Sequence, residues 1–247
     1  MSWWWTEPDD PDDPGYAPRD AGDPLDPAYL RRLARANPES WEAWYRLGWR
    51  SLATGDEAGA VEAYRRTVRL RPSNGLAWHG LGTALLRLGR TELGVHALER
   101  AVDLRPEGRG PLRLLAAVYI SLSRHEAALG PLRTLLRLEP DDADHYFDAA
   151  RCYAVLGRAR EAAVAYEEAL RRKPNHSVAR YNLGLLRALE GDVLHATAAY
   201  VELAERDAEL AARFRRTWGL IDGRGARALR AAGEALTELA AFDRRSR

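Results

Sequence analysis

Small, aromatic and aliphatic residues recur along this chain at a fixed interval of 34 residues. Within one interval, Trp44, Leu47 and Gly48 have the i, i+3, i+4 spacing that brings side chains to one face of an α-helix. Ala60 and Tyr64 follow at i, i+4 and form the same kind of face on a second helix. The hydrophobic pattern therefore predicts successive pairs of amphipathic helices.

The breaks between these predicted helices recur at the same interval. Gly55 permits the turn inside the first pair, and Pro72 ends the pair because proline disfavours helical geometry in the residue before it. The turn position holds Gly55, Gly89, Ser123, Gly157 and Gly191, and the closing position holds Pro72, Pro106, Pro140 and Pro174. Five units of 34 residues are therefore predicted between residues 41 and 210.

This residue set resembles the tetratricopeptide repeat family, whose units read W-x2-L-G, then small-x3-aromatic-x2-small, then proline. The resemblance implies an all-α fold, a right-handed α-solenoid of helix-turn-helix repeats with helical caps. Two positions depart from the family pattern: Arg180 replaces the early aromatic residue of the fifth unit, and Ala208 stands where its proline would be.

The repeats and their flanks predict four segments. These are an acidic proline-rich tail at 1–25, an N-terminal capping helix at 26–40, five repeats at 41–210 and C-terminal capping helices at 211–247. Asp26 is the expected N-cap of the first capping helix, and Pro27 is its expected first residue. Phe214 keeps the repeat register, but Trp218 stands where a small residue belongs, so a full sixth repeat is not expected.

Composition and charge exclude several classes of protein. The formal net charge is +1, which lacks the basic excess typical of nucleic-acid binders. No apolar run approaches the ~20 residues of a membrane span, and the N-terminus does not read as a secretory signal. Cys152 is the single cysteine, so an internal disulfide and a thiolate zinc site are excluded. Together these features predict a cytoplasmic protein.

The sequence offers no catalytic constellation. The histidines have no i, i+4 pair of the kind that holds a metal on a helix, and no phosphate-binding glycine loop is present. Cys152 is expected to be a small structural thiol next to Tyr153. We therefore expect no enzyme activity, no cofactor and no metal.

The resemblance places the binding surface on the first helix of each unit, which lines a concave groove in the family. The groove residues expected here are Tyr45, Trp49, His79, Arg87, Arg113, Phe147, Arg151 and Tyr181. Four of them, Tyr45, Trp49, Phe147 and Tyr181, are expected to be at least partly exposed. This aromatic, apolar and arginine-bearing set predicts a protein or peptide partner with apolar and acidic anchors.

One known subclass of the family clamps the C-terminal carboxylates of chaperones with Lys and Asn side chains. The matching positions here hold Tyr45, Trp49, Gly80, Gly110 and Leu114. None of these side chains can take that role, so a chaperone-tail clamp is not expected.

Two other classes of function remain open. The first is a structural or assembly subunit held through the solenoid ends, which would require apolar surface around Phe214, Trp218 and Leu220. The second is helical-repeat RNA binding, which requires a basic groove with uniform polar residues, and the predicted groove does not provide one.

The N-terminal tail separates the charges of the chain. Residues 1–27 hold eight acids and one base, whereas residues 28–247 hold 36 basic and 28 acidic residues, a net charge of +8. Trp3, Trp4 and Trp5 form the tail's only apolar cluster, and they are expected to anchor to a partner or to a neighbouring copy. The alternative is a solvated tail without a role. Binding to the protein's own groove is less favoured, because the prolines would have to lead the chain back over the first repeat. The acidic run disfavours a membrane surface.

Overall fold

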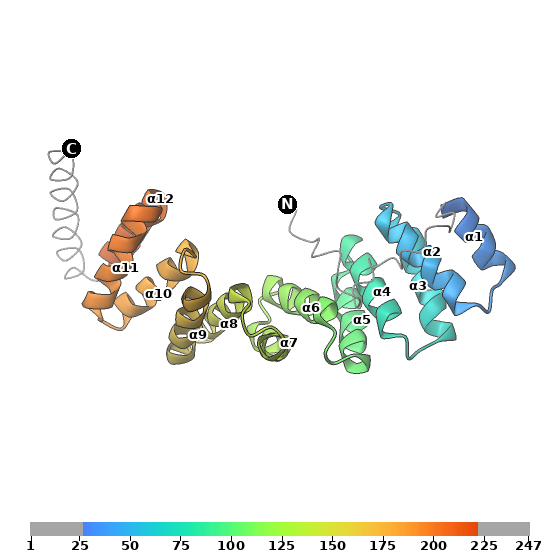
Figure 1. Ribbon diagram of the computed structural model, residues 1–247, viewed down its shortest axis with the longest axis horizontal. Helices are drawn as coiled ribbons and strands as arrows, with labels where there is room; N and C mark the ends of the chain where they lie inside the picture. Colours follow the sequence, from blue (N-terminus) through green and yellow to red (C-terminus); the bar gives the residue numbers. More distant parts are fainter. Residues whose placement is uncertain (1–26, 222–247) are drawn as a thin grey trace. The chain divides into compact units, whose positions relative to one another are not determined.

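The computed structural model describes residues 27–221, and all regular structure in this range is α-helical (Figure 1). The helices are α1 (Pro27–Ala36), α2 (Trp41–Ala53), α3 (Glu57–Leu70), α4 (Gly75–Arg87), α5 (Thr91–Leu104), α6 (Arg109–Ser121), α7 (His125–Leu138), α8 (Ala143–Val155), α9 (Ala159–Arg172), α10 (Ser177–Leu189), α11 (Val193–Arg206) and α12 (Ala208–Ile221). None of these helices is long and apolar enough to cross a membrane. The predictions for Trp3, Trp4 and Trp5, and for the chain after residue 221, lie outside the described residues.

The chain divides into two compact units, the first ending at Leu138 and the second beginning at Glu139. The first unit holds the hairpins α2–α3, α4–α5 and α6–α7, preceded by α1, which packs against α2. The second unit holds the hairpins α8–α9 and α10–α11, followed by α12, which contacts both helices of the last hairpin. The predicted all-α repeat fold is therefore confirmed.

The turn inside each hairpin requires a left-handed backbone. Four of the five turn positions are glycines, with φ between 72° and 79°. The fifth is Ser123, with φ 58°, a conformation that is unfavourable for a residue with a Cβ atom. The third hairpin thus keeps the turn geometry without the glycine that favours it.

Polar side chains fix the starts of several helices. The Asn74 side chain accepts a hydrogen bond from the Ala77 amide at 3.0 Å, and Asp56 accepts one from Gly59 at 2.9 Å. Helix α1 begins at Pro27, as the sequence predicted. These caps satisfy amide groups that would otherwise lack partners in the first turn.

Small residues allow the large ring of Tyr64 to fill the space between helices. Tyr64 is fully buried, and a Cβ atom added at Gly48 would lie 3.0 Å from its ring. A Cβ atom at Gly80, on the next hairpin, would lie 2.3 Å from the Tyr64 Cζ atom. The glycines at these two positions therefore allow the helices to approach the Tyr64 ring closely.

The early aromatic residue of the repeat is also a hydrogen-bond donor, a role that sequence reasoning missed. Side-chain N–H groups donate to proline carbonyls from Trp44 to Pro38 (3.0 Å), from Trp78 to Pro72 (2.8 Å) and from Arg180 to Pro174 (2.7 Å). Arg180 therefore replaces the indole with another donor at the same place. The Trp78 ring is only partly buried, whereas the Trp44 ring, which makes the equivalent hydrogen bond, is buried.

Helix α12 completes the core of the second unit. Phe214 and Trp218 are both fully buried, with ring centroids 5.6 Å apart. Because α12 begins at Ala208, the predicted boundary after residue 210 falls inside this helix. The described part of the C-terminal cap therefore behaves like the first helix of a further repeat.

Candidate functional site

In the first unit, two of the predicted groove residues present aromatic surface on α2. Tyr45 and Trp49 lie one turn apart on this helix, and both are partly exposed. The Tyr45 ring meets the edge of the buried Tyr64 ring with centroids 5.9 Å apart. Tyr45 therefore packs against the core, at one end of this aromatic surface.

The predicted arginines of the first unit differ in their surroundings. Arg87 is exposed near the end of α4, where its guanidinium donates a hydrogen bond to the Leu52 carbonyl at 3.1 Å. This bond ties α4 to the C-terminal turn of α2. Arg113 lies half-buried on α6.

In the second unit, the structure brings Phe147 and Arg151 together on α8. The Arg151 guanidinium lies 5.7 Å from the centre of the Phe147 ring, a cation–π contact. Phe147 also packs on the His176 ring with centroids 4.6 Å apart and remains partly exposed. Phe147 thus offers an apolar face beside the Arg151 guanidinium, which also lies 3.5 Å from an Asp148 carboxylate oxygen.

Two predicted groove residues, His79 and Tyr181, are buried, and the expected exposure of Tyr181 is wrong. His79 keeps 6% of its surface, because it packs against the start of α6 at Gly110. Burial, with the nearby charge of Arg105, lowers the pKa of His79 to about 4. Only 8% of the Tyr181 surface is exposed, because α12 covers this residue. The Tyr181 and Phe214 ring centroids are 5.9 Å apart, and the Tyr181 hydroxyl lies 3.3 Å from the Thr217 hydroxyl.

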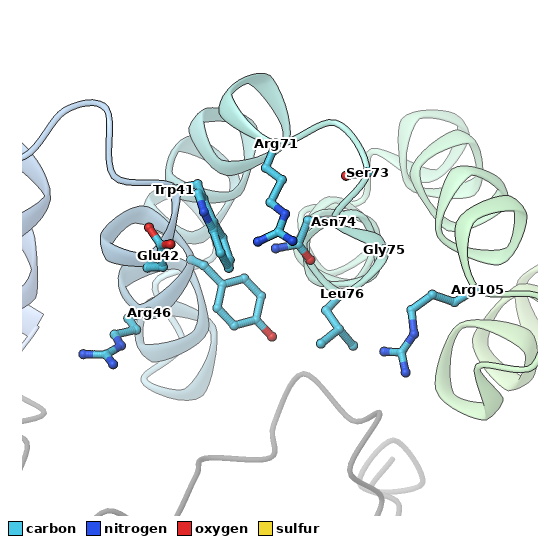
Figure 2. Close-up of a pocket in the computed structure, with 10 residues that line it drawn as sticks. Trp41, Glu42, Arg46, Arg71, Ser73, Asn74, Gly75, Leu76 and Arg105 are labelled. Atoms are coloured by element: carbon cyan, nitrogen blue, oxygen red, sulfur yellow. The ribbon is translucent and has the colours of Figure 1, made fainter.

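A surface pocket of about 530 Å³ lies where α2 meets the loop that leads into α4 (Figure 2). The residues that line it come from α2, from that loop with the start of α4, and from the end of the second hairpin. They are Trp41, Glu42, Tyr45, Arg46, Arg71, Ser73, Asn74, Gly75, Leu76 and Arg105. Three of the four charged side chains are arginines, so the lining is positively charged.

Packing against neighbouring residues positions two arginines of this pocket, Arg71 and Arg105. The Arg71 guanidinium lies 4.4 Å from the centre of the Trp41 ring, and Figure 2 shows it between Trp41 and Asn74. Arg105 lies over the start of α4, where a Cβ atom added at Gly75 would come within 2.8 Å of its Cγ atom. Glycine at position 75 therefore makes room for Arg105.

The chemistry of the pocket suits a carboxylate next to an aromatic or aliphatic group. Guanidinium groups bind carboxylates with two parallel hydrogen bonds and stack on aromatic rings. Trp41, Tyr45 and Leu76 add the apolar surface. Sequence reasoning missed this pocket, although one signal was present: Arg71 and Arg105 share a repeat position, and Gly75 stands where the first unit has Trp41.

One cluster in the second unit has the composition of a metal site. Glu139, Asp142 and His145 each offer one ligand atom within 4.8 Å of the others. The His145 Nε2 atom lies 2.8 Å from a Glu139 oxygen and 3.4 Å from an Asp142 oxygen. Asp142 also caps α8 by accepting from the Asp144 amide at 2.9 Å. These hydrogen bonds and the cap give all three side chains a structural role.

Cys152 is fully buried on α8. Burial raises the pKa of its thiol to about 11, so the reactive thiolate is scarce near neutral pH. The structure therefore agrees with the expected structural role of this residue.

Comparison with solved structures shows the same fold in several proteins. The crystal structure of YrrB, described as a TPR protein with an unusual peptide-binding site, has a TM-score of 0.68 at 19% identity and covers 76% of this chain and 97% of its own. MamA from Desulfovibrio magneticus RS-1 has a TM-score of 0.57 at 20% identity, with 72% and 96% covered. The structure of Naa15/Naa10 bound to HypK-THB has a TM-score of 0.62 at 17% identity, with 86% of this chain and 34% of that chain covered.

Sequence comparison gives the family. The search against curated proteins returns no match. A profile described as tetratricopeptide repeat matches residues 27–75, 79–143 and 113–177. Because the profile spans more than half of the chain and the described helices form its hairpins, this chain belongs to the tetratricopeptide repeat family.

Proposed function

We propose that this chain is a protein-interaction scaffold that binds a peptide or helix of a partner along the first helices of its repeats. The partner segment carries bulky apolar anchors and acidic residues. The observation that supports this most directly is the pocket between α2 and α4, where Arg71 and Arg105 flank an aromatic and aliphatic lining. Tetratricopeptide repeat proteins are generally non-enzymatic interaction modules, and the proposal assigns no reaction.

Two further features support this proposal. Tyr45 and Trp49 extend the aromatic surface of the first unit along α2, and Phe147 with Arg151 repeats the combination of ring and guanidinium in the second unit. YrrB, a similar solved structure, carries a peptide-binding site by its own description. The roles of adaptor and assembly factor and a cytoplasmic location belong to this proposal too.

The alternative function, a structural or assembly subunit held by the solenoid ends, finds less support. It requires apolar surface on the C-terminal cap. Phe214 and Trp218 are instead fully buried. In the described part of the cap, these two large rings pack into the protein's own core.

Selection of displayed peptides against the full chain tests the proposal. We expect the selected peptides to combine aromatic and acidic residues and to lose binding at least about tenfold when Arg71 is changed to Glu. Arg69→Glu is the matched control, because Arg69 is exposed on α3 and lies outside the pocket. The double variant Trp49→Ser and Phe147→Ser should also lose the peptides while keeping its helical content.

Unchanged affinity in both the Arg71 variant and the double variant would move the site away from the first helices. Selected peptides without acidic residues would leave the arginines without a role in recognition and would contradict the proposed partner chemistry.

A further inference from the structure

The pocket between α2 and α4 is a positive site whose central charge is not used inside the fold. Arg71 lies on the Trp41 ring and forms no ion pair with any described residue. An arginine held by ring stacking keeps its N–H groups available for a carboxylate, because the ring contacts its face and leaves its edge free. The Arg71 guanidinium is therefore positioned to bind an acidic ligand in the pocket.

The start of α4 also favours an acidic ligand in this pocket. Gly75 provides no side chain at the first residue of the helix, where the other units carry Trp41, Arg109, Ala143 and Ser177. The first turn of a helix favours negative charge. The Cγ atom of Arg105 lies against Gly75, and Figure 2 shows this arginine on the other side of Leu76 from Arg71. The fold thus combines two guanidinium groups with the positive end of a helix.

The chain itself contains a segment of complementary chemistry. Residues 1–26 carry eight acidic residues against one basic residue, and Trp3, Trp4 and Trp5 supply aromatic rings. Aspartates can pair with Arg71 and Arg105, and indole rings can join the surface of Trp41. Five prolines in this segment lower the entropy that it loses on binding.

The segment is also long enough and near enough. It joins the fold at Pro27, the first residue of α1, and α1 packs directly against α2, which forms one wall of the pocket. Twenty-six residues span up to about 85 Å when extended, far more than the ~35 Å that α1 and α2 would measure end to end. The pocket belongs to the first two repeats, so the segment has to return over the first repeat alone, and its extended length is sufficient for that path.

We propose that the acidic, tryptophan-bearing segment 1–26 binds in the α2–α4 pocket of its own chain and competes there with an external partner. This inference rests on the proposed function for the identity of the competitor. The tether raises the effective concentration of the segment to the millimolar range, so weak individual contacts are enough. A partner must then carry a better set of acidic and aromatic anchors to displace it.

Disulfide formation between engineered cysteines in the full chain tests the docking. One cysteine replaces Thr6, between the tryptophans and the acidic run, and the other replaces Ser73, which is exposed at the pocket. The control pair is Thr6→Cys with Ala58→Cys, because Ala58 is exposed on α3, away from the pocket. The native Cys152 is fully buried and does not interfere.

We expect the Ser73 pair to form a disulfide within one chain at least about tenfold faster than the Ala58 pair. Changing Asp9, Asp10, Asp12 and Asp13 to Asn should bring the two rates together, and these changes lie outside the described helices. Equal rates for the two pairs in the unaltered background would overturn the docking. A covalent dimer in place of the intramolecular product would also overturn it and would assign the pocket to a second copy.

The selected peptides described above separate this inference from the proposed function. If both hold, the variant with four Asp→Asn changes binds those peptides several-fold more tightly, because its competitor is weakened. If the disulfide forms but no peptide is selected, the docking stands without the scaffold function. If peptides bind equally well to both forms, the segment does not compete and the inference is wrong.

Discussion

The starts of α4 and α8 occupy the same place in the repeat, two units apart, but carry opposite charges. Arg71 precedes α4, whereas Glu139 stands at the equivalent position before α8. At the third residue of each helix, the first region has Ala77 and the second has His145. The larger side chain reaches back to Glu139 at 2.8 Å, so this loop charge is used inside the fold.

Among residues 27–221, the loop charge of the α4 region, Arg71, has no such partner. Ala77 is too small to reach Arg71, which lies on the Trp41 ring and lines the pocket. The two starts thus share a backbone that the repeat determines. The side chain at the third helix residue decides whether the charged loop residue is bound inside the protein, as Glu139 is, or is left facing a pocket, as Arg71 is.

The largest expected effect concerns the framework that supports the α4 region. Trp78→Ala removes a partly buried ring and its hydrogen bond to the Pro72 carbonyl, and it should lower the free energy of unfolding by about 3 kcal/mol. Trp49→Ala, at the surface of α2, should lower it by less than about 1 kcal/mol. Urea unfolding monitored by circular dichroism measures both. Equal losses would show that the Pro72 loop does not depend on Trp78.

A second prediction compares the buried histidines of the two regions. In the part of the chain that the structure describes, no carboxylate flanks His79 as Glu139 and Asp142 flank His145. Burial and the charge of Arg105 lower the pKa of His79 to about 4. An unfolded histidine titrates near 6.5, so the unfolded state binds more protons between these values and the folded state loses stability as pH falls through this range.

At pH 5 this loss should reach about 2 kcal/mol relative to pH 7. His79→Leu should flatten the stability profile between pH 7 and pH 5. His96→Leu is the control, because His96 is exposed on α5. A profile that is equally steep in both variants would assign the pH dependence to other groups.

The sequence predicted the repeat frame well, because interior positions recur at the 34-residue interval. The start of α1 at Pro27, the small residue at Gly48 and the left-handed turns all follow from local chemistry. The burial of Tyr181 could not be predicted in this way, because it depends on α12, whose repeat pattern is weak.

The pocket could not be predicted either, for a related physical reason. The pocket is formed by residues that are distant in sequence, among them Trp41, Gly75 and Arg105. Each of these residues is also accounted for by its place in a helix or at a helix end, so none of them indicates a pocket by itself. Only packing brings them together. His79 followed the surface spacing, but Gly110 on the next hairpin leaves room for its ring in the interior.

The smallest expected effect compares the turns of the two units. Ser123→Gly should raise the free energy of unfolding by about 0.5–1 kcal/mol, because it relieves a left-handed residue that has a Cβ atom. Gly157→Ser, at the equivalent turn of the second unit, should lower it by a similar amount. Thermal unfolding of both variants checks the pair. A destabilised Ser123→Gly variant would show that the serine side chain contributes more than the strain.

Both proposals require that Arg71 and its pocket bind an acidic segment with aromatic anchors. The most direct test is fluorescence anisotropy with a labelled peptide of residues 1–26, added to full chains that carry Asn at positions 9, 10, 12 and 13. We expect Arg71→Glu to weaken this binding at least about tenfold and Arg69→Glu to change it less than about twofold, and we expect added salt to weaken it. Equal affinity in the Arg71→Glu and Arg69→Glu chains would contradict the account.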